Sequence, residues 1–567
     1  MTPNRQPRRP ELAGDLIRRN AALKGERSDI DNLNQDIANY VMPRKNQITT
    51  TETRGSNSPE DALFDLTAVR DAQVLASGQL DYLVSGKWFM FEPPMEIEKD
   101  GPVDDARQWC QKCSEIVLKE LLRSNFRTEI HEMFLDRSTF THANLMCDEG
   151  KKALYNFRND DVGTYSIAED DEGNVDTIFR EFTMTARQAV MKFGRENVGP
   201  CIGASYDDAN KCDVEKHQFI HCVYPRKEGE YDDKKLDAQF FRIASVYVAV
   251  KDKIVCRESG YPEMPYVVTR FLKWGDSPYG YTPSIEALPA VRQVNLMVKH
   301  MAALGEIKAW PRVLLPAGME GQVDLSPGGQ TLFDPNTPAD SLPREWGTDG
   351  EWNIGERLIE MVQEQIHKAY FVDLFQMLAN LPDKQRTAYE VAQRLAEKVS
   401  SFSPTFDRLD QEVFKPILAR CFAMAFRAGR FPQPPESMLI PNPDGKTARI
   451  AVPEVTLTGK MALAIKEVES NAFVRAMEIL MPMAQLKPDV WDNIDTDAGT
   501  RMLLRNGGVP ANVIMDEEAR DEMRGARAQQ QAAAAELEGA GMAAKAAKDM
   551  NGASPEMQKA AMQAMGG

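Results

Sequence analysis

Apolar positions near the N-terminus recur at the spacing of an amphipathic helix. This pattern predicts a helix that runs into Pro43. Ser58 is followed by Pro59 and two acidic residues, which is the preferred order at a helix start. A second helix is therefore expected from Ser58 to about Ser85. The apolar face of the first helix consists of Ile30, Leu33, Ile37, Tyr40 and Val41.

The pattern changes to short alternating runs between Lys152 and about Val268. The stretch YSIAEDDEGNVDTIFREFTMT predicts two strands joined by a turn at Asp171 to Asn174. Thr185 and Gln188 form a capping box that begins a small helix, and Gly194 ends it. This order of elements favours an α+β region over an alternating parallel sheet. Further strands are expected in HQFIHCVYP, FFRIASVYVAV and MPYVVTRF.

Helical periodicity returns after WGDSPYGYTPS. One apolar stripe precedes residue 310, another follows residue 352, and residues 311–350 between them are rich in proline and glycine. Two long helices that bracket a turn-rich segment indicate a stalk with a head. The two stripes consist of Val294, Met297, Met301 and Leu304, and of Ile354, Leu358, Met361, Val362 and Ile366.

The stretch NLPDKQRTAYEVAQRLAEK sets a short charged loop directly before a strong helix start. Thr387 and Glu390 form a capping box, so a helix should begin at Thr387. The loop from Asn380 to Arg386 is either a solvated lead-in, the commoner reading of a charged loop, or a loop held toward a partner. The helix should kink or break at Pro404. A further stripe follows at Leu409, Val413, Ile417, Cys421 and Phe422.

The C-terminal part is expected to open with a hairpin within residues 429–460 and to continue with helices. The alanine-rich end favours helix by propensity but carries few large apolar residues. Such a helix is stable only when it packs against a neighbour.

Composition narrows the function. With 567 residues and 43% apolar content, the chain can bury substantial cores, and its formal charge of -17 argues against tight nonspecific binding of nucleic acid. The sequence predicts neither a membrane-spanning helix nor a secretory signal. The eight scattered cysteines suit reduced thiols better than a disulfide framework.

The sequence gives only weak signals for a phosphate-binding, metal or catalytic site. The DGKT stretch lacks the first glycine of a phosphate loop, because Ile440 stands there, so a hairpin turn is the better interpretation. In a strand His217 and His221 lie about 13 Å apart at ~3.3 Å per residue, too far to share one zinc ion with Cys212 and Cys222. Cys110 and Cys113 lack a second ligand pair. No G-x-S-x-G or HExxH motif is present, so no catalytic, cofactor or metal residue is expected.

Several stretches together resemble the head-to-tail connecting, or portal, protein of short-tailed bacteriophages. The resemblance covers most of the chain and fades after about residue 520. It is carried by RSDIDNLNQDIANYVMPRK, GQLDYLVSGKWFMFEPP, WGDSPYGYTPSIEALPAVRQVNLMVKH, PRVLLPAGMEGQVDLSPGG and FVDLFQMLANLPDKQRTAYEVAQRLAEKVSSFSPTFDRLDQEVFKPILARCF.

The resemblance implies an α+β, mainly α, portal-protein fold that assembles as a ring, usually twelve-fold, around a DNA channel. The tunnel loop would place Pro382, Asp383, Lys384, Gln385 and Arg386 at duplex DNA, with Thr387 and Glu390 anchoring it. The implied parts are a wing at 1–282 and 387–515, stem helices at 283–310 and 352–375, a clip at 311–351, the tunnel loop at 376–386, and a crown, barrel or flexible tail at 516–567.

The resemblance also implies partners. They are the terminase large subunit, which packages the DNA, then tail adaptor proteins, and the major capsid and scaffolding proteins. The protein would occupy one vertex of the virion after assembly in the host cytoplasm, with no membrane and no cofactor involved. Two rivals remain open: an α-rich structural adaptor or scaffold that forms no channel, and a metal-dependent or hydrolytic enzyme built on the strand region.

Overall fold

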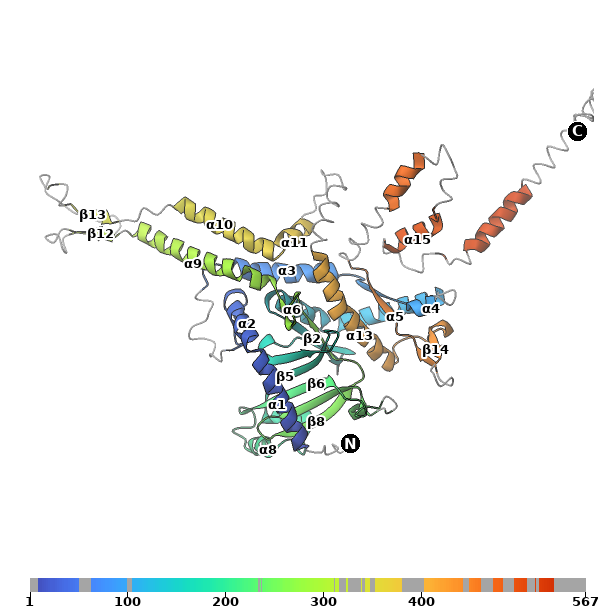
Figure 1. Cartoon of the computed structure of the whole chain (residues 1–567), viewed down its shortest axis with the longest axis horizontal. Helices are drawn as coiled ribbons and strands as arrows, with labels where there is room; N and C mark the ends of the chain where they lie inside the picture. The colour runs from blue at the N-terminus through green and yellow to red at the C-terminus, as the bar shows by residue number, and fades with distance from the viewer. Residues whose placement is uncertain are drawn as a thin grey trace, which may run out of the picture.

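The structure is a computed structural model that combines a helical body, a β-rich lobe and a pair of long helices (Figure 1). It describes residues 9–49, 63–98, 104–232, 235, 237–310, 312–315, 323–324, 338, 342–346, 352–379, 402–441, 448–459, 473–482, 494–506, 515 and 520–534. None of the helices within these ranges is both long and apolar enough to cross a membrane.

The β-rich lobe is built on a five-stranded antiparallel sheet in the order β4-β5-β6-β7-β8. Side chains alternate between its faces, so α1 (Pro10–Glu26) packs on one face, and α7 (Ala186–Phe193) with α8 (Pro200–Asp207) packs on the other. The expected α+β character is confirmed here. The strands are β4 (Tyr165–Glu169), β5 (Val175–Thr185), β6 (Lys216–Pro225), β7 (Ile243–Ala249) and β8 (Ile254–Tyr261).

The turn and the helix cap that the sequence predicts in the lobe are both present. Asp170 accepts hydrogen bonds from the backbone N–H groups of Glu172 and Asn174, which closes the turn between β4 and β5. Thr185 and Gln188 form the expected capping box, and α7 ends at Gly194, whose φ of 89° suits glycine.

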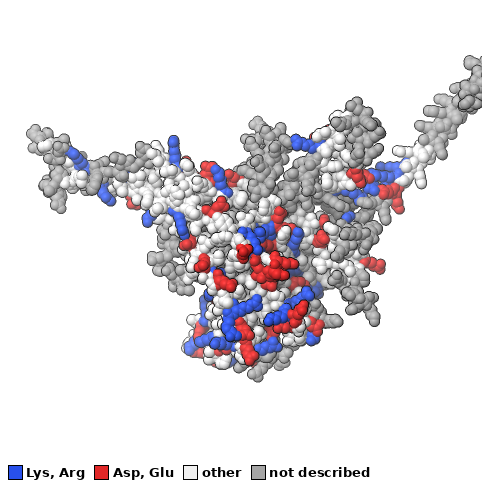
Figure 2. Space-filling model, in the orientation of Figure 1, with Lys and Arg blue, Asp and Glu red and all other residues white. Residues whose placement is uncertain are grey.

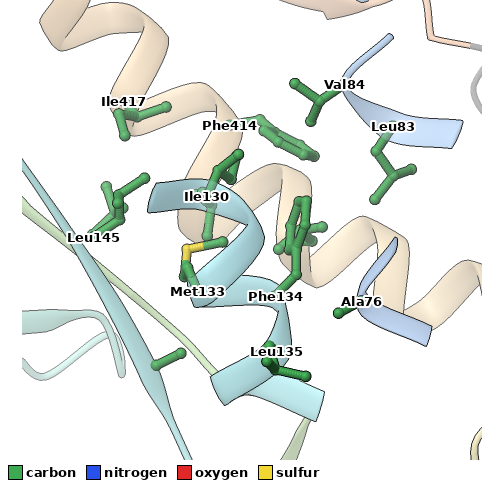
Figure 3. Close-up of a cluster of buried hydrophobic side chains, with 14 of the residues drawn as sticks. Ala76, Leu83, Val84, Ile130, Met133, Phe134, Leu135, Leu145, Phe414 and Ile417 are labelled. Atoms are coloured by element: carbon green, nitrogen blue, oxygen red, sulfur yellow. The ribbon is translucent and has the colours of Figure 1, made fainter. Parts of the chain in front are cut away.

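The helical body holds the largest core. In it α6 (Phe126–Thr139) lies between α3 (Thr67–Leu83), the long helix at residues 402–427 and a small sheet in the order β3-β2-β9 (Figure 3). Around them lie α2 (Ser28–Val41), η1 (Pro43–Lys45), α4 (Met95–Glu98), α5 (Asp104–Arg123) and η3 (Val162–Thr164), with β2 (Ala143–Glu149), β3 (Tyr155–Arg158) and β9 (Tyr266–Thr269). The short η4 (Ala238–Phe240) lies in the lobe, beside β8.

The N-terminal helices are confirmed in part. The expected amphipathic helix is α2, which ends just before Pro43. The proposed start at Ser58 lies outside the described residues, but residues 63–66 are not helical, so one continuous helix from Ser58 to Ser85 is wrong. The helix begins at Thr67, where the Asp65 carboxylate accepts the Thr67 backbone N–H and supplies a local helix start.

The stalk suggested by the sequence consists of α9 (Pro283–Ala309) and α10 (Trp352–Ala369), which run side by side away from the body (Figure 1). At their far end β12 (Arg312–Leu314) pairs with β13 (Arg344–Trp346). The helical range 352–375 is not continuous, because Phe371 adopts a φ of 55° between α10 and α11 (Val372–Ala379). The hairpin of β10 (Leu272–Trp274) and β11 (Ser277–Tyr281) leads into α9.

The long helix after residue 401 differs from expectation at Pro404. Residues 402–409 are helical across this proline, so of the expected kink or break, the break does not occur. Phe402 and Thr405 on either side of it are buried, and their packing holds the turn. The irregularity comes later, as a π-turn at η7 (Asp410–Phe414) before α13 (Lys415–Arg427), while all five residues of the predicted apolar stripe are buried.

The C-terminal part contains the predicted hairpin. It is formed by β14 (Leu439–Pro441) and β15 (Ala448–Ile450), although the DGKT turn itself lies outside the described residues. β16 (Glu454–Leu457) returns to pair with β1 (Phe89–Glu92) near the start of the chain. The remaining elements are η8 (Glu436–Met438), a helix at residues 473–482, α15 (Thr496–Asn506) and a helix at residues 520–534.

Candidate functional site

The predicted loop residues Pro382, Asp383, Lys384, Gln385 and Arg386, with Thr387 and Glu390, lie outside the described residues. The structure does describe the two ends of the segment that carries them, residues 380–401. α11 delivers the chain to residue 379, and the long helix receives it again at Phe402.

An aromatic clasp joins these two ends. The Phe402 ring contacts Phe375 at 6.0 Å, Phe371 at 5.6 Å and Phe271 at 6.3 Å between ring centroids. Edge-on aromatic contacts of this kind add about 0.5–1.5 kcal/mol each beyond burial. The described residues on either side of this segment therefore lie together.

A buried arginine on α6 fixes the returning end. Arg137 donates through Nη2 to the Thr405 carbonyl at 2.9 Å and through Nε to Thr269 Oγ1 at 3.2 Å. Its guanidinium lies 4.9 Å from the Phe271 ring centroid. Burial lowers the pKa of Arg137 to about 9, against the opposing charge of Glu412, so the side chain remains charged at neutral pH. Its charge is satisfied without a direct carboxylate partner.

Arg270 joins three parts of the molecule. The carboxylate of Glu412 in the π-turn accepts hydrogen bonds from the Arg270 backbone N–H at 2.9 Å and from Arg270 Nη2 at 2.8 Å. Glu169 at the end of β4 and the Gly173 carbonyl in the following turn also accept from the guanidinium, as does the Pro278 carbonyl in β11. The lobe, the hairpin before α9 and the long helix therefore meet at one largely buried side chain.

The base of the paired helices is fixed to the body by polar contacts. In α9, Ser284 shares a 2.8 Å hydrogen bond with the Tyr370 hydroxyl and donates to the Ser138 carbonyl. In α10, His367 Nδ1 lies 2.7 Å from an Asp71 carboxylate oxygen of α3. Burial raises the pKa of Asp71, and the neighbouring His367 opposes that shift.

Close helix packing along the paired helices and beside their base depends on glycine. A side chain at Gly355 of α10 would collide with Met301 of α9, and one at Gly78 of α3 would collide with the Phe375 ring of α11. Both positions allow two helices to approach more closely than any larger residue permits.

Farther out, the paired helices expose large apolar side chains. Ile354, Leu358 and Met361 of α10 have exposed fractions of 55%, 45% and 60%, and Leu296 of α9 is 52% exposed. Their spacing of four and three residues places the α10 side chains in one stripe. Charged side chains are sparse over these helices in Figure 2. An exposed apolar stripe of this kind indicates a surface that another molecule covers.

The candidate metal residues have other surroundings. His221 lies 3.0 Å from Ser245 Oγ and stacks on Tyr247, while burial raises the pKa values of the Cys110 and Cys113 thiols to about 12. All eight cysteines fall within the described residues and are free. Those same parts of the chain contain no group of three or more His, Cys, Asp or Glu side chains placed to hold a metal.

Sequence reasoning did not identify Arg137, Arg270, Tyr370 or the aromatic clasp. A partial signal existed for Arg270, because a charged residue directly after the apolar run YVVT is unusual unless it is paired. Its partners lie 101 and 142 positions away, at Glu169 and Glu412, which no local pattern reveals.

Comparison with known proteins gives a consistent result over nearly the whole chain. A family model described as bacteriophage head to tail connecting protein matches residues 13–515. The portal protein of Salmonella phage epsilon15 is 26% identical over 547 residues, covering 94% of this chain and 95% of that protein. The probable portal protein of Bordetella phage BPP-1 is 26% identical over 526 residues, covering 92% of each.

Among solved structures, the virion of a native gene transfer agent particle contains a chain that is 12% identical. The match covers 78% of this chain and 95% of that one, with a TM-score of 0.35. This likeness is too low to carry an argument about the fold.

Proposed function

Because this chain belongs to the family of bacteriophage head to tail connecting proteins, we propose that it forms a closed ring with a central channel at one vertex of the phage capsid. The protein is a structural connector and not an enzyme, and it assembles with capsid and tail proteins. The proposed ring has twelve subunits and the portal fold expected from the resemblance. In it, α9 and α10 form the stem, residues 311–351 the clip and residues 516–567 a crown, barrel or tail.

The exposed stripe on the paired helices carries this proposal. α10 turns Gly355 toward Met301 of α9, and at 3.6 residues per turn Ile354, Leu358 and Met361 lie about 60–120° around the helix from Gly355, on one exposed flank of α10. On α9, Leu296 is rotated about 140° from Met301, at 3.6 residues per turn. Each subunit thus offers apolar surface on two different sides of the stem. Two unlike surfaces that pair between neighbours generate a closed ring when the rotation between subunits closes.

Light scattering and negative-stain imaging of the purified chain test the ring. A twelve-fold ring would have a mass of about 763 kDa, which is 12 × 63.6 kDa, and would show a central hole. A strictly monomeric species at all concentrations would instead favour the rival proposal, an α-rich structural adaptor or scaffold without a channel.

Substitution in the stripe tests the interface. The double variant Ile354→Gln with Met361→Gln should lose the ring while its circular dichroism spectrum stays unchanged, because both side chains are exposed in the single subunit. The control is Leu122→Gln, whose side chain is 70% exposed on α5, outside the stem. A ring that survives the double variant would place the subunit interface elsewhere.

We further propose that double-stranded DNA passes through the channel without being read for sequence. The charge of -17 supports weak retention, because tight binding would require many Lys and Arg contacts to phosphates. The tunnel loop with Lys384 and Arg386 would touch the backbone, and Thr387 and Glu390 would anchor it. The aromatic clasp around Phe402 supports a projecting loop, because both ends of residues 380–401 lie together.

Alanine substitution tests the loop. Lys384→Ala with Arg386→Ala should leave the ring intact in negative stain and reduce the amount of DNA packaged or retained per particle. Loss of the ring itself would contradict the placement of these residues in the channel.

The remaining partners follow from the same proposal. The clip would dock the terminase large subunit during packaging and tail adaptor proteins afterwards, while the wing would meet the major capsid and scaffolding proteins. Assembly would take place in the host cytoplasm, without a membrane or cofactor. Trp310 directly before the clip and Leu314 at its start are 67% and 52% exposed, which supports a docking surface there.

A further inference from the structure

One face of the lobe sheet carries a row of polar side chains across four strands. The strand register places Arg180 of β5 opposite His221 of β6, His221 opposite Tyr247 of β7, and Tyr247 opposite Arg257 of β8. His221 and Tyr247 stack with their ring centroids 4.1 Å apart. From α7, which covers this face, Lys192 extends over the Tyr247 ring with Nζ 4.3 Å from the centroid.

Positive charge exceeds negative charge around this row. Arg158 of β3 and Arg180 share the buried Asp160 carboxylate at 2.7 and 2.8 Å. Lys192 and Arg257 have no ion pair among the described residues. The four cations, Arg158, Arg180, Lys192 and Arg257, form what we call the cationic cluster. Against them stand two acids, Asp160 and Asp148.

The four cations of the cationic cluster repel one another, and the two nearby acids do not balance their charge. The Lys192 side chain is exposed, but its ammonium lies over the Tyr247 ring, and this local desolvation lowers its pKa to about 8. The charges of Arg158, Arg180 and Arg257 add to that shift, and Asp148 opposes it. The buried imidazole of His221 has its pKa lowered by burial and by the same four cations, so it stays neutral and adds no charge. An anion placed among these groups would remove repulsion that the free protein retains.

We infer that the cationic cluster binds carboxylates of an acidic protein segment. Lys192 and Arg257 are exposed and can reach a ligand, whereas Arg158 and Arg180 are held in place by Asp160. An exposed cation paired with a partner's carboxylate through charge-assisted hydrogen bonds gives both affinity and orientation. This inference concerns the lobe and does not depend on the ring or the channel.

The surroundings favour a short acidic segment over duplex DNA. The α7–α8 side of the lobe carries Asp207, Asp208 and Asp213. Duplex DNA bears one negative charge per ~1.7 Å and requires an extended positive surface. The cluster exposes only two cations, Lys192 and Arg257, and so does not provide such a surface. A compact cluster bordered by acids suits two or three carboxylates on a flexible segment.

The test uses the full-length protein and fluorescein-labelled hexaglutamate, with binding followed by fluorescence anisotropy at low salt. The double variant Lys192→Gln with Arg257→Gln should weaken binding by about a hundredfold, since each of the two lost charge-assisted contacts is worth roughly a factor of ten. The matched control is Lys211→Gln with Lys235→Gln. It removes the same charge from the same lobe, but those lysines pair with Asp208 and Asp232.

A pH series supplies a second readout. A bound carboxylate favours protonated Lys192, so hexaglutamate affinity should fall as pH rises through about 8, and Lys192→Gln should abolish this step. The proposal is overturned if hexaglutamate does not bind or if the control variant loses as much affinity as the cluster variant. It is also overturned if a short DNA duplex binds the cluster more tightly than hexaglutamate.

Discussion

At the residue scale, Gly78 shows how one missing side chain sets the position of the stem base. A Cβ there would collide with the Phe375 ring of α11. Gly78→Ala should therefore lower the free energy of unfolding by about 1–3 kcal/mol, the usual cost of overpacking, despite the better helix propensity of alanine. Chemical denaturation followed by circular dichroism measures the change.

Gly14→Ala is the control for this prediction. Gly14 also lies inside a helix, α1, but nothing would lie within 4 Å of an added Cβ. Alanine there should be neutral or stabilising by about 0.5–1 kcal/mol. If the two variants behaved alike, the close approach of α3 and α11 would not constrain the fold.

At the element scale, the aromatic clasp should control how firmly residues 380–401 are held. Phe402→Ala would remove a ring that is 1% exposed and touches Phe271, Phe371 and Phe375. The expected cost is about 3–5 kcal/mol, as for other buried aromatic truncations. Hydrogen exchange should accelerate in α11 and at residues 402–409 before it changes in α1. Phe426→Ala, in the same long helix but 41% exposed, should leave those rates unchanged.

The elements predicted correctly from sequence are those with local signals. The capping box at Thr185, the turn after Asp170 and the amphipathic face of α2 each lie within a few residues, so a local pattern determines them. The π-turn has a distant partner, because Glu412 within it pairs with Arg270, and no local pattern indicates the break at Phe371.

The candidate site divides in the same way. Its loop was identified from a capping box and from resemblance, and its residues lie outside the described ranges. The aromatic clasp and Arg137 lie within the described residues, and their contacts join α6, α11 and the long helix, which are far apart in the sequence. Neither periodicity nor spacing encodes such contacts.

At the scale of the whole molecule, the lobe, the stem base and the long helix are joined at Arg270. Its side chain is 4% exposed, and Glu412 can reach it from the π-turn, where the helix departs from regular geometry. π-turns are rare and often mark functional positions, because a favourable contact must compensate for them. The long helix follows the proposed tunnel loop. A displacement of this helix would therefore change the contacts of Arg270 with the lobe and with the hairpin before α9.

Glu412→Gln tests this coupling. The amide still accepts one hydrogen bond, but the charge opposite Arg270 and Arg408 is lost, leaving Glu169 as the remaining carboxylate. Removing one member of a buried pair typically costs ~3–5 kcal/mol, and the retained Glu169 should limit the loss to about 3 kcal/mol. Hydrogen exchange should accelerate together in the β4–β5 turn, the β10–β11 hairpin and residues 402–427.

Lys415→Gln is the matched control, because Lys415 pairs with Asp410 on the same helix at 2.9 Å but is 52% exposed. An exposed pair contributes about 0–1 kcal/mol, so this variant should change neither stability nor exchange in the lobe. Acceleration confined to the long helix in Glu412→Gln would mean that Arg270 stabilises three neighbours separately. Acceleration in all three would mean that their stabilities are coupled through Arg270. The long helix after the proposed tunnel loop and the lobe with the cationic cluster would then open together.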